Sequence, residues 1–203
     1  VSRTVAMSNK YFGGVLENAG AKEDVDDDLI ATVTGAYEKV RAKINESRIP
    51  DALSEIFVIF KRANKYIDET MPWALAKDES KTARLKTVLY NLAESIVIGT
   101  SLLEPFMPDT AAKVTSYFGT TVRDYGRIVR FGGIENGTKV VENPEILFRR
   151  LDVKEVVDKA HEMYEARKKP AAPEVKEEEK PEIDIDYFAG LDLRVAKVVA
   201  CEK

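Results

Sequence analysis

Cysteine and histidine are almost absent from this sequence. Its 203 residues include one cysteine, Cys201, and one histidine, His161. No disulfide can form within the chain, and a zinc site would lack most of its usual ligands. His161 lies among charged residues such as Glu162 and Glu165, which indicates a solvated histidine and not a catalytic one. We therefore expect no metal and no catalytic residue in this chain.

The sequence also lacks a signal peptide and an apolar stretch long enough to cross a bilayer. Together with the absence of disulfides, this is consistent with a cytoplasmic protein that has no membrane partner. The formal net charge is −4, so we expect no general affinity for DNA, and any RNA contact must come from a local patch. The pairs Gly13-Gly14 and Gly132-Gly133 lack the lysine and serine of a phosphate-binding loop.

Apolar residues recur at helical spacing over most of the chain, which predicts an all-α fold. We expect an antiparallel helical bundle over residues 1–167. One helix should end near residue 10, and the next should start at an aspartate cap among residues 26–28 and run through Ile44. Further helices are expected before Trp73 and over about 82–103, 109–118 and 153–167, with a less regular stretch and a short extended pair within 119–150.

The composition changes after this region. Residues 168–182 contain Pro170, Pro173 and Pro181 in a run of lysine and glutamate, which predicts a disordered linker. Residues 183–203 alternate apolar and polar side chains, as the first strand region of an all-β domain would, but its partner strands would lie beyond Lys203. At the other end, Val1 lies inside an expected helix. We therefore expect that the chain is a fragment of a longer protein.

The only tryptophan, Trp73, follows Pro72 at the end of a strongly periodic helix. Because proline ends a helix or forces a turn, we expect the indole ring just beyond the helix C-terminus. The amide of Asn64 and the carboxylate of Asp68 precede it, and a surface that combines these two groups with an aromatic ring suits an unstacked base. The alternative is a core aromatic, which the pattern alone favours because buried aromatics outnumber base platforms. Asn64 adjoins Ala63 within the apolar stripe, which favours a packing amide over direct base contact.

The block around this tryptophan reads Asn64-x-Tyr66-x-Asp68-x-x-x-Pro72-Trp73, followed by Ala74-Leu75-Ala76-Lys77. With residues 1–7, 9–14, 104–108 and 144–152, it resembles the anticodon-binding helical domain of methionyl-tRNA synthetases. Residues 183–200, with the core Asp192-Leu193-Arg194-Val195-Ala196-Lys197, resemble the start of the tRNA-binding oligonucleotide-fold domain that many of these synthetases carry. In some members that domain pairs two subunits, which implies a homodimer only for a protein that contains all of it.

The resemblance also implies roles for single residues. In the family, the tryptophan that Trp73 matches stacks on a base of the methionine anticodon, and an arginine that Arg3 matches contacts the same wobble-position base. Asp68 matches a carboxylate that supports anticodon selectivity, and Asn64 is implied to pack more than to contact RNA. Two departures are visible: Lys61 stands where some members have another acid, and the family's asparagine one turn before the arginine has no match.

These matches imply the anticodon-recognition part of a ligase that uses ATP to attach methionine to its tRNA. The family's catalytic signatures, His-Ile-Gly-His and Lys-Met-Ser-Lys-Ser, do not occur. We therefore expect no cofactor in this chain, ATP in a domain outside it, and no activity of the fragment alone. One alternative is a freestanding tRNA-binding, synthetase-associated module, and another is a helical protein-interaction scaffold in which Trp73 is buried.

The linker prediction can be tested by limited digestion with trypsin. We expect the first cuts at Lys168 or Lys176, because proline, glutamate and lysine leave this segment nothing to bury. Mass spectrometry of the early fragments identifies the cleaved bonds. Resistance at these lysines, with earlier cleavage inside the bundle of residues 1–167, would show that the linker prediction is wrong.

Overall fold

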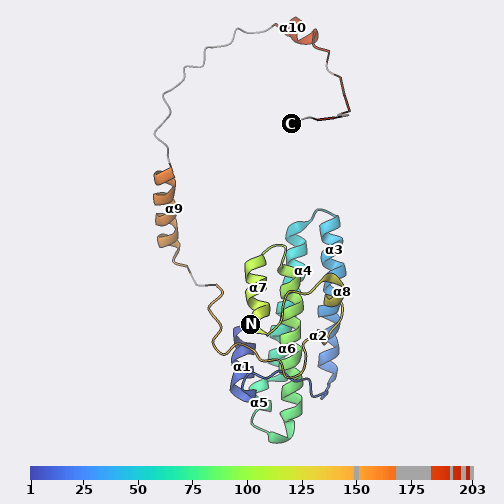
Figure 1. Ribbon diagram of the computed structural model, residues 1–203, viewed down its shortest axis with the longest axis vertical. Helices are drawn as coiled ribbons and strands as arrows, with labels where there is room; N and C mark the ends of the chain where they lie inside the picture. Colours follow the sequence, from blue (N-terminus) through green and yellow to red (C-terminus); the bar gives the residue numbers. More distant parts are fainter. Residues whose placement is uncertain (149–150, 168–183, 193, 198–199, 202–203) are drawn as a thin grey trace. The chain divides into compact units, whose positions relative to one another are not determined.

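A computed structural model describes residues 1–148, 151–167, 184–192, 194–197 and 200–201 (Figure 1). These residues divide into two compact units, Val1–Phe148 and Arg149–Lys203. The first unit is a helical bundle without a β-strand, and its one isolated antiparallel bridge joins Val15 to Lys139. The all-α prediction is therefore confirmed, whereas the predicted linker, residues 168–182, lies outside the described residues.

The bundle consists of α1 (Ser2–Phe12), α2 (Asp24–Thr34), α3 (Ala36–Asn45), α4 (Ile49–Thr70), α5 (Pro72–Leu75), the 3-10 turn η1 (Glu79–Lys81), α6 (Thr82–Leu103), α7 (Pro108–Tyr117) and α8 (Tyr125–Ile128). Helix α6 runs through its middle, with α1 on one side and α2 and α3 on the other (Figure 1). Nearly every residue of α6 from Arg84 to Leu103 is buried. A helix covered on all sides shows no single apolar stripe.

Helix α2 begins before the predicted aspartate cap. Glu23 is the N-cap, and the Glu23 N–H donates to Asp26 Oδ2 over 3.1 Å in a reciprocal capping box. Asp26 therefore lies three residues inside the helix, where its carboxylate also binds side chains of the core. The predicted helix through Ile44 is divided at Gly35 into α2 and α3.

Two clusters of buried apolar side chains form the core. One gathers α2, α3, α4 and α6, and its larger members are Leu29, Ile56, Ile59, Tyr66, Leu89 and Leu92. The other gathers α1, α6, α7 and the chain that follows α7, with Val5, Leu16, Tyr90, Val97, Phe118 and Ile134. Residues 14–16 bind residues 137–140 through backbone hydrogen bonds, such as Leu16 N to Thr138 O at 2.8 Å. The extended pair expected within 119–150 forms instead between these distant segments.

A buried carboxylate holds the irregular chain after α7 against α6. Glu94 is fully buried, and its oxygens accept hydrogen bonds from Arg123 Nη1 at 2.5 Å and Nη2 at 2.9 Å. They also accept from the backbone N–H groups of Gly132, Gly133 and Ile134 at 2.7–3.1 Å. Because the carboxylate satisfies five donors at once, it fixes the irregular chain on both sides of the short helix α8.

The second unit contains α9 (Val153–Arg167) and α10 (Ile185–Ala189). Helix α9 has the predicted bounds, and none of its residues is buried. The strand expected from residue 183 onward is contradicted at 185–189, where the chain is helical and the Asp184 side chain accepts from Asp186 N. A lone strand leaves its backbone groups unpaired, whereas a capped helical turn pairs them locally. None of the helices in the described ranges is long and apolar enough to cross a membrane.

Replacing Glu94 tests its role in the fold. We expect Glu94→Gln to lower the free energy of unfolding by about 3–5 kcal/mol, because it leaves the buried Arg123 guanidinium without a counter-charge. The matched control is Glu38→Gln, which breaks a solvent-exposed pair with Arg41 and should cost less than about 1 kcal/mol. Urea unfolding followed by circular dichroism measures both. Equal losses in the two variants would contradict this role.

Candidate nucleic-acid interface

The chain turns sharply between α4 and α5, and this turn determines where Trp73 lies. Met71 has a left-handed backbone with φ 42° and ψ 66°, and its N–H donates to Ile67 O over 3.0 Å. Pro72 then starts α5, where a missing N–H costs no hydrogen bond. Pro72 is buried, but Trp73 is 43% exposed. The pattern-based preference for a core tryptophan is therefore wrong, and an accessible ring stands beyond the end of α4.

The backbone at Met71 is strained. Among the described residues, only Ser47 and Met71 have a positive φ without being glycine. A side chain makes this conformation unfavourable, and such residues cluster at functional sites. Here the left-handed residue ends α4 and leads directly into α5, where the Trp73 indole is exposed at the surface.

A hollow of about 210 Å³ lies between α1, α4 and α6. Arg3 and Asn64 both line it, although 61 positions separate them in sequence. The remaining lining residues are Val1, Ser2, Thr4, Phe60, Ala63, Ile67, Leu92 and Ile96. An apolar floor with a cation and an amide at its edge is typical of a ligand-binding hollow. Phe60 and Ile67 were not predicted as site residues, because their spacing in the sequence indicates only that they face other helices.

The side chain of Asn64 is exposed, so the predicted packing role is wrong. Successive residues of a helix are turned by about 100° from each other. Ala63 and Ile67 are buried, and Asn64 therefore faces the opening of the hollow instead of the core. Asp68, one turn further along α4, is exposed too. Neither side chain has a hydrogen bond or ion pair to another described residue.

The structure brings the predicted residues together only in part. Arg3 is exposed and pairs with no carboxylate in the described part of the chain, so its guanidinium is available to a ligand. Arg3 and Asn64 share the hollow, whereas Asp68 and Trp73 do not line it. Asp68 continues the face of α4 that carries Asn64, and Trp73 follows where that helix ends. The four residues offer stacking, hydrogen bonding and charge.

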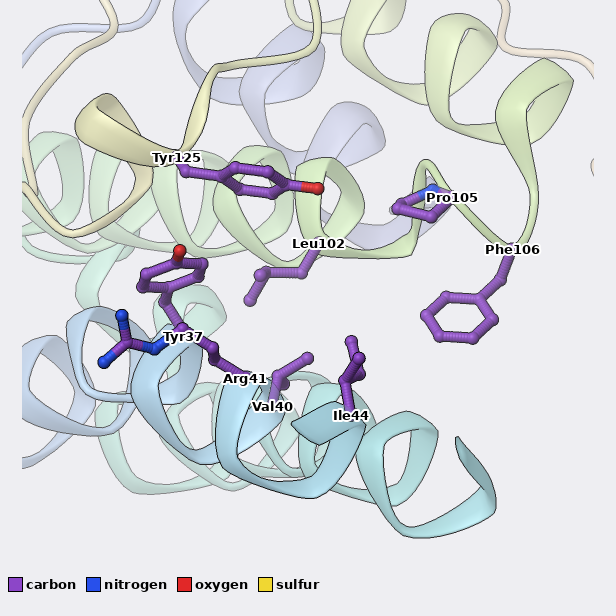
Figure 2. Close-up of a pocket in the computed structure, with 8 residues that line it drawn as sticks. All are labelled: Tyr37, Val40, Arg41, Ile44, Leu102, Pro105, Phe106 and Tyr125. Carbon is purple, nitrogen blue, oxygen red and sulfur yellow. The ribbon is translucent and has the colours of Figure 1, made fainter. Parts of the chain in front are cut away.

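A second hollow, of about 170 Å³, lies between α3, the end of α6 and α8 (Figure 2). The rings of Tyr37 and Tyr125 stack there with centroids 5.4 Å apart, and the Arg41 guanidinium lies 5.8 Å from the Tyr37 centroid. Leu102, Phe106 and other apolar side chains line the rest. None of the predicted site residues lines this hollow, so it is separate from the candidate interface.

Comparison with known proteins identifies the family. The model of the anticodon binding domain of methionyl tRNA ligase matches residues 16–169. The chain belongs to this family. A methionine–tRNA ligase of Clostridium perfringens is 44% identical over all of this chain, and one of Bacillus subtilis is 37% identical. The chain spans 31% of the first relative and 32% of the second.

Solved structures give the same fold. The free form of methionyl-tRNA synthetase from Mycobacterium tuberculosis superposes with a TM-score of 0.69 at 29% identity, over 74% of this chain and 31% of that one. The same enzyme in complex with methionyl-adenylate gives a TM-score of 0.67 at 31% identity, over 73% and 29%. Arg3 precedes the region that the anticodon-binding family model matches, but the relatives align over the whole chain.

The exposure of Trp73 predicts how much this ring contributes to stability. We expect Trp73→Ala to lower the free energy of unfolding by about 1–2 kcal/mol, since much of the ring is already in water. A fully buried aromatic would cost about 3–5 kcal/mol. Thermal and urea unfolding of this variant measure the difference. A loss in the range of a buried aromatic would contradict the surface position.

Proposed function

We propose that this chain binds the anticodon loop of a methionine tRNA. The observation that carries the proposal is the half-exposed Trp73, held beyond α4 by a strained turn in a member of an anticodon-binding family. Anticodon loops offer unpaired bases with exposed faces and edges, which proteins bind by aromatic stacking and a few hydrogen bonds. An accessible indole next to the face of α4 that carries Asn64 and Asp68 meets these needs.

Affinity and selectivity come from different residues in this proposal. Stacking on Trp73 contributes about 1–3 kcal/mol and tolerates every base. Arg3 supplies donors for a polar base edge, and a base with the wrong edge is penalised because its groups stay unpaired. Asp68 adds selection by repelling electronegative groups that approach the same face of α4. Asn64 lines the same hollow as Arg3, so we assign its exposed amide to direct base contact.

We further propose that the whole protein is a methionine–tRNA ligase. It would use ATP, bound in a domain outside this chain, to attach methionine to its tRNA in the cytoplasm. Curated relatives of which this chain spans about a third carry that name, which favours the ligase over a freestanding binding module. A complete C-terminal oligonucleotide-fold domain would be the source of any homodimer. The scaffold alternative required a buried Trp73, and the exposed ring removes its basis.

The binding proposal is tested with a synthetic RNA hairpin of the methionine anticodon stem and loop. We expect Trp73→Ala to raise the dissociation constant by about 5- to 100-fold, the equivalent of one lost base stack. Trp73→Phe should recover part of the affinity, because a smaller ring still stacks. Tyr125→Ala is the control, since Tyr125 is another exposed aromatic but lines the separate hollow.

The selectivity proposal needs a second hairpin, whose first anticodon base is changed. Arg3→Ala should weaken binding of the correct hairpin more than that of the changed one and so reduce the ratio of the two affinities. Calorimetric titration at a fixed salt concentration measures each affinity. Unchanged hairpin binding by Trp73→Ala, or an equal loss in Tyr125→Ala, would contradict the proposed function.

A further inference from the structure

Two faces of the second half of α4 have different surroundings. Asn64 and Asp68 are exposed on one face, whereas Arg62 and Tyr66 are buried on another. The helix is rigid over this distance, so a rotation or tilt at the buried face moves the exposed residues with it. The contacts of the buried face therefore determine where Asn64, Asp68 and the turn to Trp73 lie.

Tyr66 joins three helices through its hydroxyl group. This hydroxyl donates to Asp26 Oδ1 of α2 over 2.6 Å and accepts from Asn91 Nδ2 of α6 over 3.2 Å. Asp26 also accepts from Arg84 Nη1 at 2.6 Å and Nη2 at 2.8 Å. Tyr66 is fully buried and Asp26 is 1% exposed. A buried network whose members are hydrogen-bonded to each other permits few alternative arrangements.

Arg62 makes a second anchor one turn earlier. Its Nε donates to Asp28 Oδ2 at 2.5 Å, and its Nη2 donates to Val25 O at 3.2 Å, so both bonds reach α2. Its Nη1 donates to Glu69 Oε2 at 2.9 Å, within the last turn of α4. One nearly buried guanidinium thus ties the final turn of α4 to the start of α2.

The anchors are connected to the tryptophan through the backbone. Thr70 Oγ1 donates to Tyr66 O over 2.7 Å, and Met71 follows in its left-handed conformation. Trp73 stands seven residues after Tyr66, beyond Pro72. A strained backbone conformation such as that of Met71 persists only when the surrounding structure stabilises it. The hydrogen bonds of Tyr66 and Thr70 lie directly before Met71 and supply such contacts.

We propose that Tyr66, through its partners Asp26 and Arg84, and Arg62 are positioning residues for anticodon binding. The network fixes the rotation of α4, so that Asn64, Asp68 and Trp73 stand ready for an unstacked base before RNA arrives. An interface held in its bound geometry loses less freedom on binding, and so binds more tightly and more selectively. This inference rests on the proposed function, because it concerns the same site.

Tyr66→Phe tests the proposal, with Tyr90→Phe as a matched control. Both tyrosines are buried, and each donates one hydrogen bond, from Tyr66 to Asp26 and from Tyr90 to Ile134 O at 2.7 Å. Both variants should lose stability, and Tyr66→Phe should lose more, because it breaks a bond to a carboxylate and a second bond from Asn91. In titrations of the 203-residue chain well below either melting temperature, only Tyr66→Phe should weaken hairpin binding, by about 3- to 10-fold. It should also lower the affinity ratio between the correct and the changed hairpin.

A second variant keeps the test decisive if Tyr66→Phe does not fold. Arg62→Lys retains the charge but cannot bind Asp28, Glu69 and the backbone of α2 together, so it should weaken binding in the same direction. Wild-type affinity and selectivity in a folded Tyr66→Phe or Arg62→Lys would overturn the positioning role, as would an equal loss in Tyr90→Phe. Unchanged binding in Trp73→Ala is a separate outcome that overturns the proposed function itself.

Discussion

The buried carboxylate of Asp26 connects three helices of the bundle. Asp26 belongs to the first turn of α2 and binds Arg84 of α6 and Tyr66 of α4. Burial alone would raise its pKa, but the hydrogen bonds from Arg84 and Tyr66 outweigh that effect and hold the pKa below its ordinary value of 3.8. A lowered folded-state pKa makes this carboxylate stabilising above pH 3.8, and that stabilisation disappears as the pH falls through the folded-state value.

This constraint explains how a surface with few interactions of its own can be well defined. Arg3, Asn64 and Asp68 bind no other described side chain, which leaves them available to the proposed RNA ligand. The buried residues of α4 hold this helix in place. The strained backbone at Met71 then brings Trp73 out of the core. Under the proposed function, stability and RNA recognition depend on opposite faces of α4, so the residues of one face can be replaced while those of the other are kept.

The sequence predicted the all-α bundle and the bounds of α6 and α9 because long apolar periodicity reports directly on helices. It mispredicted the burial of Trp73, because that burial depends on a left-handed turn at Met71, a residue type that gives no sign of it. The pairing of Asp26 with Arg84, 58 positions away, also has no local signal. Arg3 could be selected among the many basic residues only through family resemblance, and a capping aspartate turned the expected strand at 185–189 into a helix.

The most direct measurement uses Trp73 as its own reporter. It is the only tryptophan, so tryptophan emission from this chain reports on this ring alone. Titration with the methionine anticodon hairpin should quench the emission in a saturable way, and bound RNA should protect the ring from acrylamide. Hairpin binding confirmed by calorimetry, but without a change in emission or in acrylamide quenching, would show that the RNA binds elsewhere and would contradict the stacking role.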